Sequence, residues 1–431
     1  MLFEIENIGK IKKASLKMDG ITVLAGENST GKSTIGKAFY CIFNAFYNSE
    51  REMQQERKYN IQEILSHFIR RYVFRGVGNY PLNRRLGGIV DEILENSNSC
   101  HAAKKVALEF VEKYVTERHG EASTDFLTAE KQQLLEEICS SLNVSNEQLQ
   151  KLLLTKFVQG EFEGQIHHVN FADTQGGISL RIKGNELNAK ITDNECSDYF
   201  DDVGILYNAF YIDTPFIMDD INSQSRRNHC SENYTEFSHR WHLLKNLRSK
   251  ISEGNLVNEV IVKQKLESVF VLMQTVVNGD FRKMDFGGLG FQEKGLLKPL
   301  AFTNISAGMK MFLVIRRLLE TGKIKERGVL ILDEPEIHLH PEWQLVFAEL
   351  LVLLQKQLDL TILLTTHSPY FLEAVEEFSK KYGTAGHIHY YLTQNENGYC
   401  SVQDVTNETV SIYRHLALPF QKLEEMRYAD K

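Results

Sequence analysis

Nine residues near the start of the chain have the types and spacing needed to hold a phosphate group. The run Gly26, Glu27, Asn28, Ser29, Thr30, Gly31, Lys32, Ser33 and Thr34 matches the pattern GxxxxGK[ST]. In this pattern the glycines let backbone N–H groups curl around phosphate oxygens, the lysine reaches the β- and γ-phosphates, and the following hydroxyl binds Mg²⁺. We therefore predict an anion cradle in which Lys32 stabilises charge and Ser33 is a metal ligand.

The flanking residues supply the elements that this loop requires. Residues 21–25 are apolar and β-branched, which predicts a strand, and residues 33–48 contain no proline and one glycine, which predicts a helix. A helix that begins at the loop adds positive potential where the anion lies. Without such flanks the same residues could be a glycine-rich turn with no function.

A second set of candidate residues follows the apolar run at positions 329–332. A strand this apolar is buried on both faces, which favours a central parallel strand, and Asp333 then lies at the carboxyl end where such sheets bind ligands. We predict that Asp333 and Ser33 bind Mg²⁺ and that Glu334 acts on the attacking water. In isolation Glu334 would be a surface acid.

Two more motifs stand at the ends of predicted elements. The apolar run at 360–365 predicts another buried strand, and His367 at its end is a candidate donor near the γ-phosphate, although a lone histidine is more often part of a core. Ser306 is a natural N-cap for a helix that reaches Glu320, and Gly308 follows it. A helix start needs no function by itself.

Composition limits the classes of protein to which the chain can belong. It has 431 residues, 42% of them hydrophobic, and a net charge of −8. No apolar run approaches the roughly 18 residues that cross a bilayer, so we predict no membrane partner and a cytoplasmic location. The six cysteines have no CxxC spacing and are predicted to be ordinary thiols.

The predicted fold is an α/β nucleotide-binding head, with a mixed sheet plus a mostly parallel core sheet, interrupted by mainly helical insertions. The head comprises residues 1–48 with the phosphate loop, 160–215 with further strands, and 285–431 with the remaining motifs. Residues 49–159 and 216–284 are the predicted insertions. We also expect strands over 165–171 and 205–212, and two short helices at the C-terminus.

The first insertion contains a basic stretch with aromatic residues. Between residues 64 and 90 there is no acid, and the stretch contains Arg70, Arg71, Arg75, Arg84 and Arg85. Such a composition suits phosphates and unstacked bases, and makes nucleic acid a candidate partner. A solvated helix face, or a surface for an acidic protein, remains the alternative. In the second insertion Cys230, His239 and His242 fit no standard zinc spacing and are predicted to be ordinary side chains.

Taken together, the segments GENSTGKST, SAGMK, LILDEPEIHLHPEW and LLTTHSPYFL resemble the motifs of ABC-type ATPase heads of the RecF, SMC and OLD kind, often grouped as AAA-family ATPases. The HLHP segment is similar to OLD-type proteins and to ATPase subunits of anti-phage systems such as Septu and PARIS. The resemblance implies ATP and Mg²⁺ as cofactors and a homodimer in which two heads enclose two ATP molecules. Ser306 and Gly308 of one copy would then act on ATP held by the other, and His367 would read the γ-phosphate.

The chain departs from those families in two places. Relatives carry a glutamine after the strand that leads into the insertion, whereas this strand ends at Asp213, so that Asp213 or Gln165 would have to substitute. OLD nucleases carry a C-terminal Toprim domain, for which about 60 residues after His367 are too few. We therefore expect a separately encoded effector, a nuclease or toxin, controlled by this ATPase as a sensor or scaffold. A DNA-repair ATPase is the alternative, and a transporter subunit is disfavoured.

Overall fold

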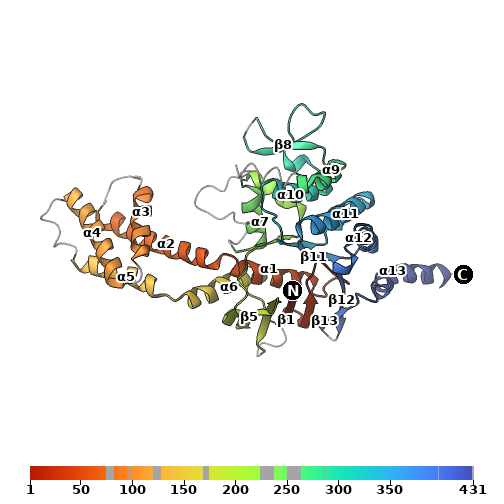
Figure 1. Cartoon of the computed structure of the whole chain (residues 1–431), viewed down its shortest axis with the longest axis horizontal. Coiled ribbons are helices and arrows are strands. Elements are labelled where there is room, and N and C mark those ends of the chain that lie inside the picture. Colours follow the sequence, from red (N-terminus) through yellow and green to blue (C-terminus); the bar gives the residue numbers. More distant parts are fainter. Residues whose placement is uncertain are drawn as a thin grey trace. The chain divides into compact units, whose positions relative to one another are not determined.

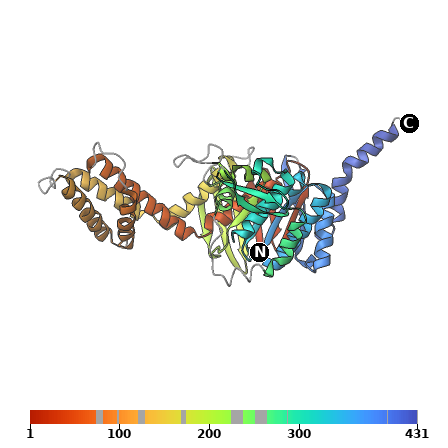
Figure 2. The ribbon, with the colours of Figure 1, turned by 90° about the horizontal axis from the view of Figure 1, so that it is seen from above.

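The computed structural model describes residues 1–73, 82–96, 99–119, 128–167, 174–223, 237–249, 264–285, 287–396 and 398–429 (Figures 1 and 2). It divides into two compact units. The main unit contains residues 1–47 and 153–431, and the helical unit contains residues 48–152.

An eleven-stranded sheet runs through the main unit in the order β6-β5-β4-β1-β2-β13-β12-β3-β11-β10-β7. One part is antiparallel and consists of β1 (Leu2–Ile8), β2 (Ile11–Lys17), β4 (Gly176–Ile182), β5 (Asn185–Thr192) and β6 (Glu195–Asp201). The other part is parallel and consists of β12 (Ile388–Glu396), β3 (Ile21–Gly26), β11 (Thr361–Thr366), β10 (Val329–Asp333) and β7 (Ala209–Ile212). Between them β13 (Tyr399–Asp404) pairs antiparallel with β12 and parallel with β2.

The parallel strands are apolar because helices cover both of their faces. Leu330 and Leu332 belong to one buried cluster and Ile331 to the other, as the alternation of a strand requires. The helix that follows the phosphate loop, α1 (Lys32–Phe46), packs in the second cluster. The first cluster contains α10 (Ala307–Glu320), α11 (Pro341–Leu358) and α12 (Pro369–Tyr382). The predicted α/β P-loop fold with a mixed sheet is confirmed.

Helix starts follow the local sequence. Ser306 caps α10 by accepting from the Met309 N–H, and Ser368 caps α12 by accepting from the Phe371 N–H. Pro341 and Pro369 occupy the first turns of α11 and α12, where no backbone donor is required.

Residues 216–284 contribute to the main unit and do not form a unit of their own. They contain part of a 3₁₀ helix (Pro215–Asn222), α7 (His239–Leu247), α9 (Glu267–Gln274) and β8 (Gly279–Lys283), which pairs with β9 (Leu289–Glu293). Leu243, Leu244 and Val269 are buried in the first cluster, because α7 and α9 turn apolar side chains toward the helices on that face of the sheet.

Three smaller predictions are wrong. The strand expected over 205–212 begins only at Ala209. Within 165–167 the expected strand is reduced to an isolated bridge between Ile8 and His167, and residues 168–171 lie outside the described part of the chain. The C-terminal segment is one helix, α13 (Val410–Ala429), and not two short ones.

The helical unit has its own core. It contains α2 (Ser49–Phe68), a π-turn (Ile69–Val73), α3 (Leu82–Glu95), α4 (Cys100–His119), α5 (Thr128–Asn143) and the start of α6 (Asn146–Phe162). Its buried side chains, such as Leu65, Leu86 and Ile138, form a third apolar cluster.

The prediction of ordinary thiols is corrected in this unit. Cys100 and Cys139 form a disulfide, with Cα atoms 5.8 Å apart. They are 39 residues apart in the sequence, so only the packing of α4 against α5 reveals that they are neighbours. Cys41, Cys196 and Cys400 are buried thiols that take no part in this disulfide. Across the described ranges, no helix combines the length and the apolar character that a membrane span requires.

Candidate nucleotide site

The phosphate loop connects β3 to α1, and its glycines are required by close contacts. Gly31 has φ +83° and Gly26 has φ +148°, a backbone region that side chains rarely adopt. A Cβ at Gly26 would lie 2.3 Å from the Thr393 carbonyl oxygen, and one at Gly31 would lie 2.3 Å from Cδ1 of Ile11. The loop is therefore packed tightly against β12 and β2.

The loop is also hydrogen-bonded into a fixed shape. Thr30 is buried and donates to the Glu27 carbonyl oxygen at 2.7 Å, and its hydroxyl lies 2.6 Å from that of Thr393 on β12. At the outer side, His415 on α13 places its Nε2 3.5 Å from a Glu27 carboxylate oxygen.

Lys32 lies within the curl of the loop. Its side chain is 4% exposed, and its ammonium donates to the carbonyl oxygens of Gly26 at 3.2 Å and Glu27 at 2.8 Å. Burial lowers the pKa of Lys32, and the carboxylates of Glu334, Asp333 and Glu336 act in the opposite direction. An ammonium has three donors, so one remains for an anion in the loop.

Asp333 lies at the carboxyl end of β10, where both neighbouring strands hold its carboxylate. Tyr211 on β7 donates to Oδ2 at 2.8 Å, and Thr365 on β11 donates to Oδ1 at 2.5 Å. A carboxylate accepts about four hydrogen bonds, so these two leave room for a cation.

The oxygen donors at this edge of the sheet suit a Mg²⁺ ion that is bound partly by the protein and partly by phosphate and water. They do not resemble a site in which protein side chains supply every ligand. In the described part of the chain, no group of three or more His, Cys, Asp or Glu side chains could hold a metal ion. Mg²⁺ is commonly bound by one or two protein oxygens together with substrate phosphates and water, and the Ser33 hydroxyl and Asp333 carboxylate are donors of that kind.

Glu334 and His367 are brought together. Glu334 has a left-handed backbone (φ 50°, ψ 50°), and its N–H donates to the Thr365 hydroxyl at 2.9 Å. Its carboxylate lies 2.7 Å from Nε2 of His367, and this contact, with the charges of His367 and Lys32, lowers the pKa of Glu334. Glu334 is therefore an ionised carboxylate at neutral pH, as a residue that accepts a proton must be.

Glu336 is a residue of this site for which the sequence analysis assigned no role. It is 4% exposed and accepts from the Thr366 hydroxyl at 2.6 Å and from the His367 N–H at 2.9 Å. Burial raises its pKa, and among the described residues no hydrogen-bond partner reaches its second oxygen. Glu336 joins the loop after β10 to the loop after β11. The signal for Glu336 in the sequence was a further acid, two residues after Glu334.

Ser306 and Gly308 stand at the start of α10. The Ser306 side chain is exposed, whereas Gly308 is buried against the loop after β10. A Cβ at Gly308 would lie 2.9 Å from the His338 carbonyl oxygen and 3.0 Å from the Trp343 ring, so a larger residue would displace α10 from that loop.

Asp213, considered as a substitute for the missing glutamine, has other partners. It accepts from Nε of Arg240 at 2.9 Å and lies 3.3 Å from Nε2 of His239, and Glu161 lies 2.7 Å from Nδ1 of the same ring. Burial alone would lower the pKa of His239, but Asp213 and Glu161 raise it to about 9. Burial would raise the pKa of Asp213, yet His239 and Arg240 lower it below its ordinary value. The other candidate, Gln165, is exposed in the turn after α6.

Of the other candidates considered in this region, His242 is described and Cys230 is not. His242 is stacked on Phe210 with ring centroids 5.2 Å apart, and burial lowers its pKa to about 4. Cys230 lies outside the described residues.

The basic stretch is described only in part. Arg70 and Arg71 are exposed on the π-turn, and the Arg71 guanidinium lies 5.4 Å from the centre of the Tyr72 ring. Phe68 is buried in the core of the helical unit, so this aromatic serves packing. Arg75 lies outside the described residues. For Arg84 and Arg85 only the backbone, in α3, is described.

A family model and several solved structures are similar to this chain. Residues 179–373 match the family model described as "AAA domain, putative AbiEii toxin, Type IV TA system". Over this range the chain is similar to an AAA domain. The matched range includes Ser306, Asp333, Glu334 and His367, and the phosphate loop precedes it in the sequence.

Solved structures of SMC heads are also similar to this chain. One is the SMC head domain from Thermotoga maritima, with 10% identity and a TM-score of 0.39, covering 94% of this chain and 98% of that one. Another is an SmcHead bound to the C-winged helix domain of ScpA, with 11% identity and a TM-score of 0.41, covering 95% and 98%.

Proposed function

We propose that this protein binds MgATP at the carboxyl ends of β3, β10 and β11 and hydrolyses it. The observation that carries the proposal is the convergence of Lys32, Asp333, Glu334 and His367, which come from three separate segments of the chain. A phosphate loop that only bound an anion would not need Asp333, Glu334 or His367 beside it.

Each of these side chains has a role that follows from its surroundings. The loop N–H groups and the Lys32 ammonium hold the β- and γ-phosphates. Glu334, ionised and adjacent to His367, accepts the proton of the attacking water, and His367 donates to the γ-phosphate. Ser33 and Asp333 would hold Mg²⁺, which supplies charge neutralisation on the phosphates when bound.

The test replaces the general base without changing its size. Glu334→Gln is expected to reduce the turnover number by about 10²- to 10⁴-fold while ATP binding persists. Phosphate release measures turnover, and fluorescence titration with a labelled ATP analogue measures binding. Glu349→Gln, on α11 and paired with Lys381, is the matched control and should keep wild-type turnover. Unchanged turnover in Glu334→Gln would remove this residue from the role.

We also infer a head-to-tail homodimer in which Ser306 and Gly308 complete the site of the other copy. The exposed serine at a helix N-terminus is suited to contact a γ-phosphate, because the helix end carries positive potential. Lys32→Ala and Ser306→Arg variants should each be inactive alone. An equal mixture should recover part of the activity, because the mixed dimer then contains one site with intact residues from both copies. No recovery, with dimers present by light scattering, would contradict shared sites.

At the level of the cell, we propose a sensor or scaffold subunit that controls a separate effector in anti-phage defence. The family model's reference to a toxin of a type IV system supports this reading over a transporter subunit. The second candidate is a DNA-binding ATPase, favoured by Arg70 and Arg71, which are exposed side by side on the π-turn. Salt-dependent binding of a DNA duplex that is lost in Arg70→Ala/Arg71→Ala would favour DNA. Stable co-purification with a neighbouring gene product, without DNA affinity, would favour the effector.

A further inference from the structure

We propose that Tyr211 is a positioning residue for the Asp333 carboxylate, and that a buried ion cluster of Glu161, Asp213, His239 and Arg240 holds Tyr211 in place. The inference rests on the proposed function, because it treats Asp333 as a ligand of Mg²⁺. It assigns a role to Tyr211, Glu161 and Arg240, for which the sequence predicted none.

The contact between Tyr211 and Asp333 crosses two adjacent strands. Tyr211 is 1% exposed on β7, opposite Ile331 of β10, and its hydroxyl donates to Oδ2 of Asp333 at 2.8 Å. Thr365 on the other side donates to Oδ1. With one donor on each oxygen, the plane of the carboxylate is fixed, and the remaining lone pairs point in defined directions. Partners of this kind orient metal ligands and tune affinity.

The Tyr211 ring is itself confined. His239 stacks on it with centroids 4.4 Å apart and planes 25° apart. On another side lies α1, the helix of the phosphate loop, where a Cβ added at Gly36 would be in ordinary van der Waals contact with the Tyr211 hydroxyl oxygen, at 3.5 Å. The hydroxyl therefore has little freedom to turn away from Asp333.

His239 is held on both sides by carboxylates. Glu161 accepts from the His239 backbone N–H and lies 2.7 Å from Nδ1, while Asp213 lies 3.3 Å from Nε2 and also binds Arg240. Two carboxylates thus face an imidazolium and a guanidinium, so the cluster is electrically balanced. Removing one member would leave a buried charge without its partner, which is strongly destabilising.

The residues of the ion cluster come from several elements that meet close to Asp333. Glu161 lies in the last turn of α6, Asp213 follows β7, and His239 begins α7. Lys37 of α1 donates to the Glu161 carbonyl oxygen at 3.0 Å. Because Glu161 belongs to α6, the position of this helix affects the position of Tyr211. Through Tyr211 it also affects the orientation of the Asp333 carboxylate.

The decisive experiment separates metal affinity from nucleotide affinity in the full chain. Mn²⁺ binding is measured by electron paramagnetic resonance with a non-hydrolysable ATP analogue present, and binding of a fluorescent ATP analogue is measured in EDTA. Tyr211→Phe removes only the hydroxyl and is expected to weaken Mn²⁺ binding by about 10-fold, with metal-free nucleotide affinity unchanged. A merely structural role would lower both affinities together.

Tyr391→Phe is the matched control, because Tyr391 is 2% exposed in the same sheet and its hydroxyl accepts from the Lys17 N–H. It should leave both affinities at wild-type values. Asp333→Asn separates the positioning role of Tyr211 from the metal-ligand role of Asp333. If Asp333→Asn weakens Mn²⁺ binding and Tyr211→Phe does not, the positioning role is wrong; if neither does, Asp333 is not the metal ligand and the proposed function fails at that residue.

The ion cluster is tested by His239→Gln and by the milder Glu161→Gln, which keeps a hydrogen-bond acceptor. Either variant, if folded by circular dichroism, should weaken Mn²⁺ binding in the same direction as Tyr211→Phe. Wild-type Mn²⁺ affinity in a folded His239→Gln or Glu161→Gln protein would overturn the claim that the cluster holds Tyr211.

Discussion

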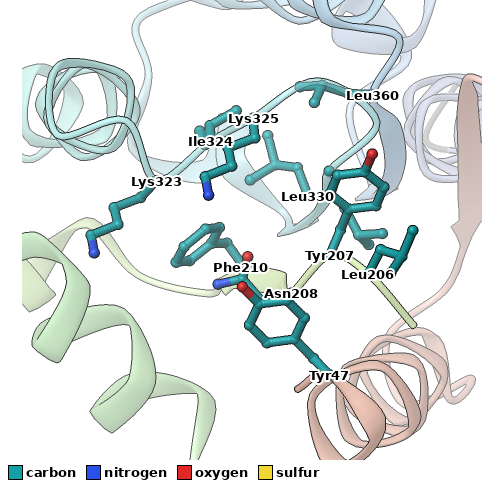
Figure 3. A pocket seen from close by; sticks show the side chains of 12 residues that line it. Tyr47, Leu206, Tyr207, Asn208, Phe210, Lys323, Ile324, Lys325, Leu330 and Leu360 are labelled. Carbon is teal, nitrogen blue, oxygen red and sulfur yellow. The ribbon is translucent and has the colours of Figure 1, made fainter. Parts of the chain in front are cut away.

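The two ends of the same parallel strands differ sharply in chemistry. At the carboxyl ends of β10 and β11 lie Asp333, Glu334 and His367, with their hydrogen-bond partners. At the amino ends of β7 and β10 lies a pocket of about 80 Å³ (Figure 3), and none of the described residues that line it is acidic. Its lining is mainly apolar and aromatic, with lysines at 323 and 325: Tyr47, Leu206, Tyr207, Asn208, Phe210, Lys323, Ile324, Lys325, Gly328, Val329, Leu330 and Leu360.

The difference is explained by which helix ends meet each edge. Helices α1 and α12 begin just after the carboxyl ends of β3 and β11, so their N-terminal N–H groups favour anions there. At the opposite edge α1 ends near Tyr47, and α10 ends just before Lys323, where cations are favoured. The carboxyl ends of the parallel strands are thus suited to binding phosphate, and their amino ends are suited to packing apolar side chains.

The largest expected effect is a loss of stability that leaves nucleotide affinity unchanged. Leu330→Ala at the amino end of β10 removes a side chain that is 1% exposed and should lower the free energy of unfolding by about 2–5 kcal/mol. The affinity for a fluorescent ATP analogue should not change, because the phosphate loop keeps its contacts. Urea unfolding and nucleotide titration measure the two quantities. Leu206→Ala, at a residue that is 75% exposed in the same pocket, should change neither. A large loss of nucleotide affinity in Leu330→Ala would break the distinction between the two ends.

The next effect tests the anion cradle directly. Lys32→Ala should weaken nucleotide binding by about 10- to 100-fold, because a hydrogen bond to a charged group contributes roughly 1.5–3 kcal/mol. Lys323→Ala removes a lysine from the other end of the sheet and should bind nucleotide as the wild type does. Equal losses in the two variants would show that general positive charge, and not the loop, holds the nucleotide.

The smallest effect concerns pH. The pKa of His239 rises from 6.5 to about 9 in the folded protein, so its contribution to stability is complete below pH 6.5 and is lost as the pH rises through 9. The lowered pKa of Asp213 acts oppositely, contributing above its ordinary value of 3.8 and losing that contribution in acid. The wild type should therefore lose stability relative to His239→Gln between pH 6.5 and 9, on the order of 1–3 kcal/mol. Urea midpoints across this range measure the difference, and parallel curves would contradict a charged His239 in the fold.

Much of the site could be predicted because its signals are local. The run 329–332 is apolar on every residue, which only a strand covered on both faces tolerates, and β10 spans Val329–Asp333. Ser306 and Ser368 cap helices because their side chains reach N–H groups three residues ahead. The reduced strand before Ile212, the single helix α13 and the Cys100–Cys139 disulfide were missed, because packing partners far along the chain decide each of them.

The phosphate loop, the acids that follow β10 and the histidine that follows β11 could be located from the sequence, since each depends on a few consecutive residues and on where a strand ends. The side chains that hold them could be found only once the elements were packed together. Tyr211 reaches Asp333 across 122 residues, and His239 reaches Glu161 across 78. Hydrogen bonds between such distant positions leave no periodicity or spacing in the sequence, because they arise only when β7, α6 and α7 pack together beside the sheet.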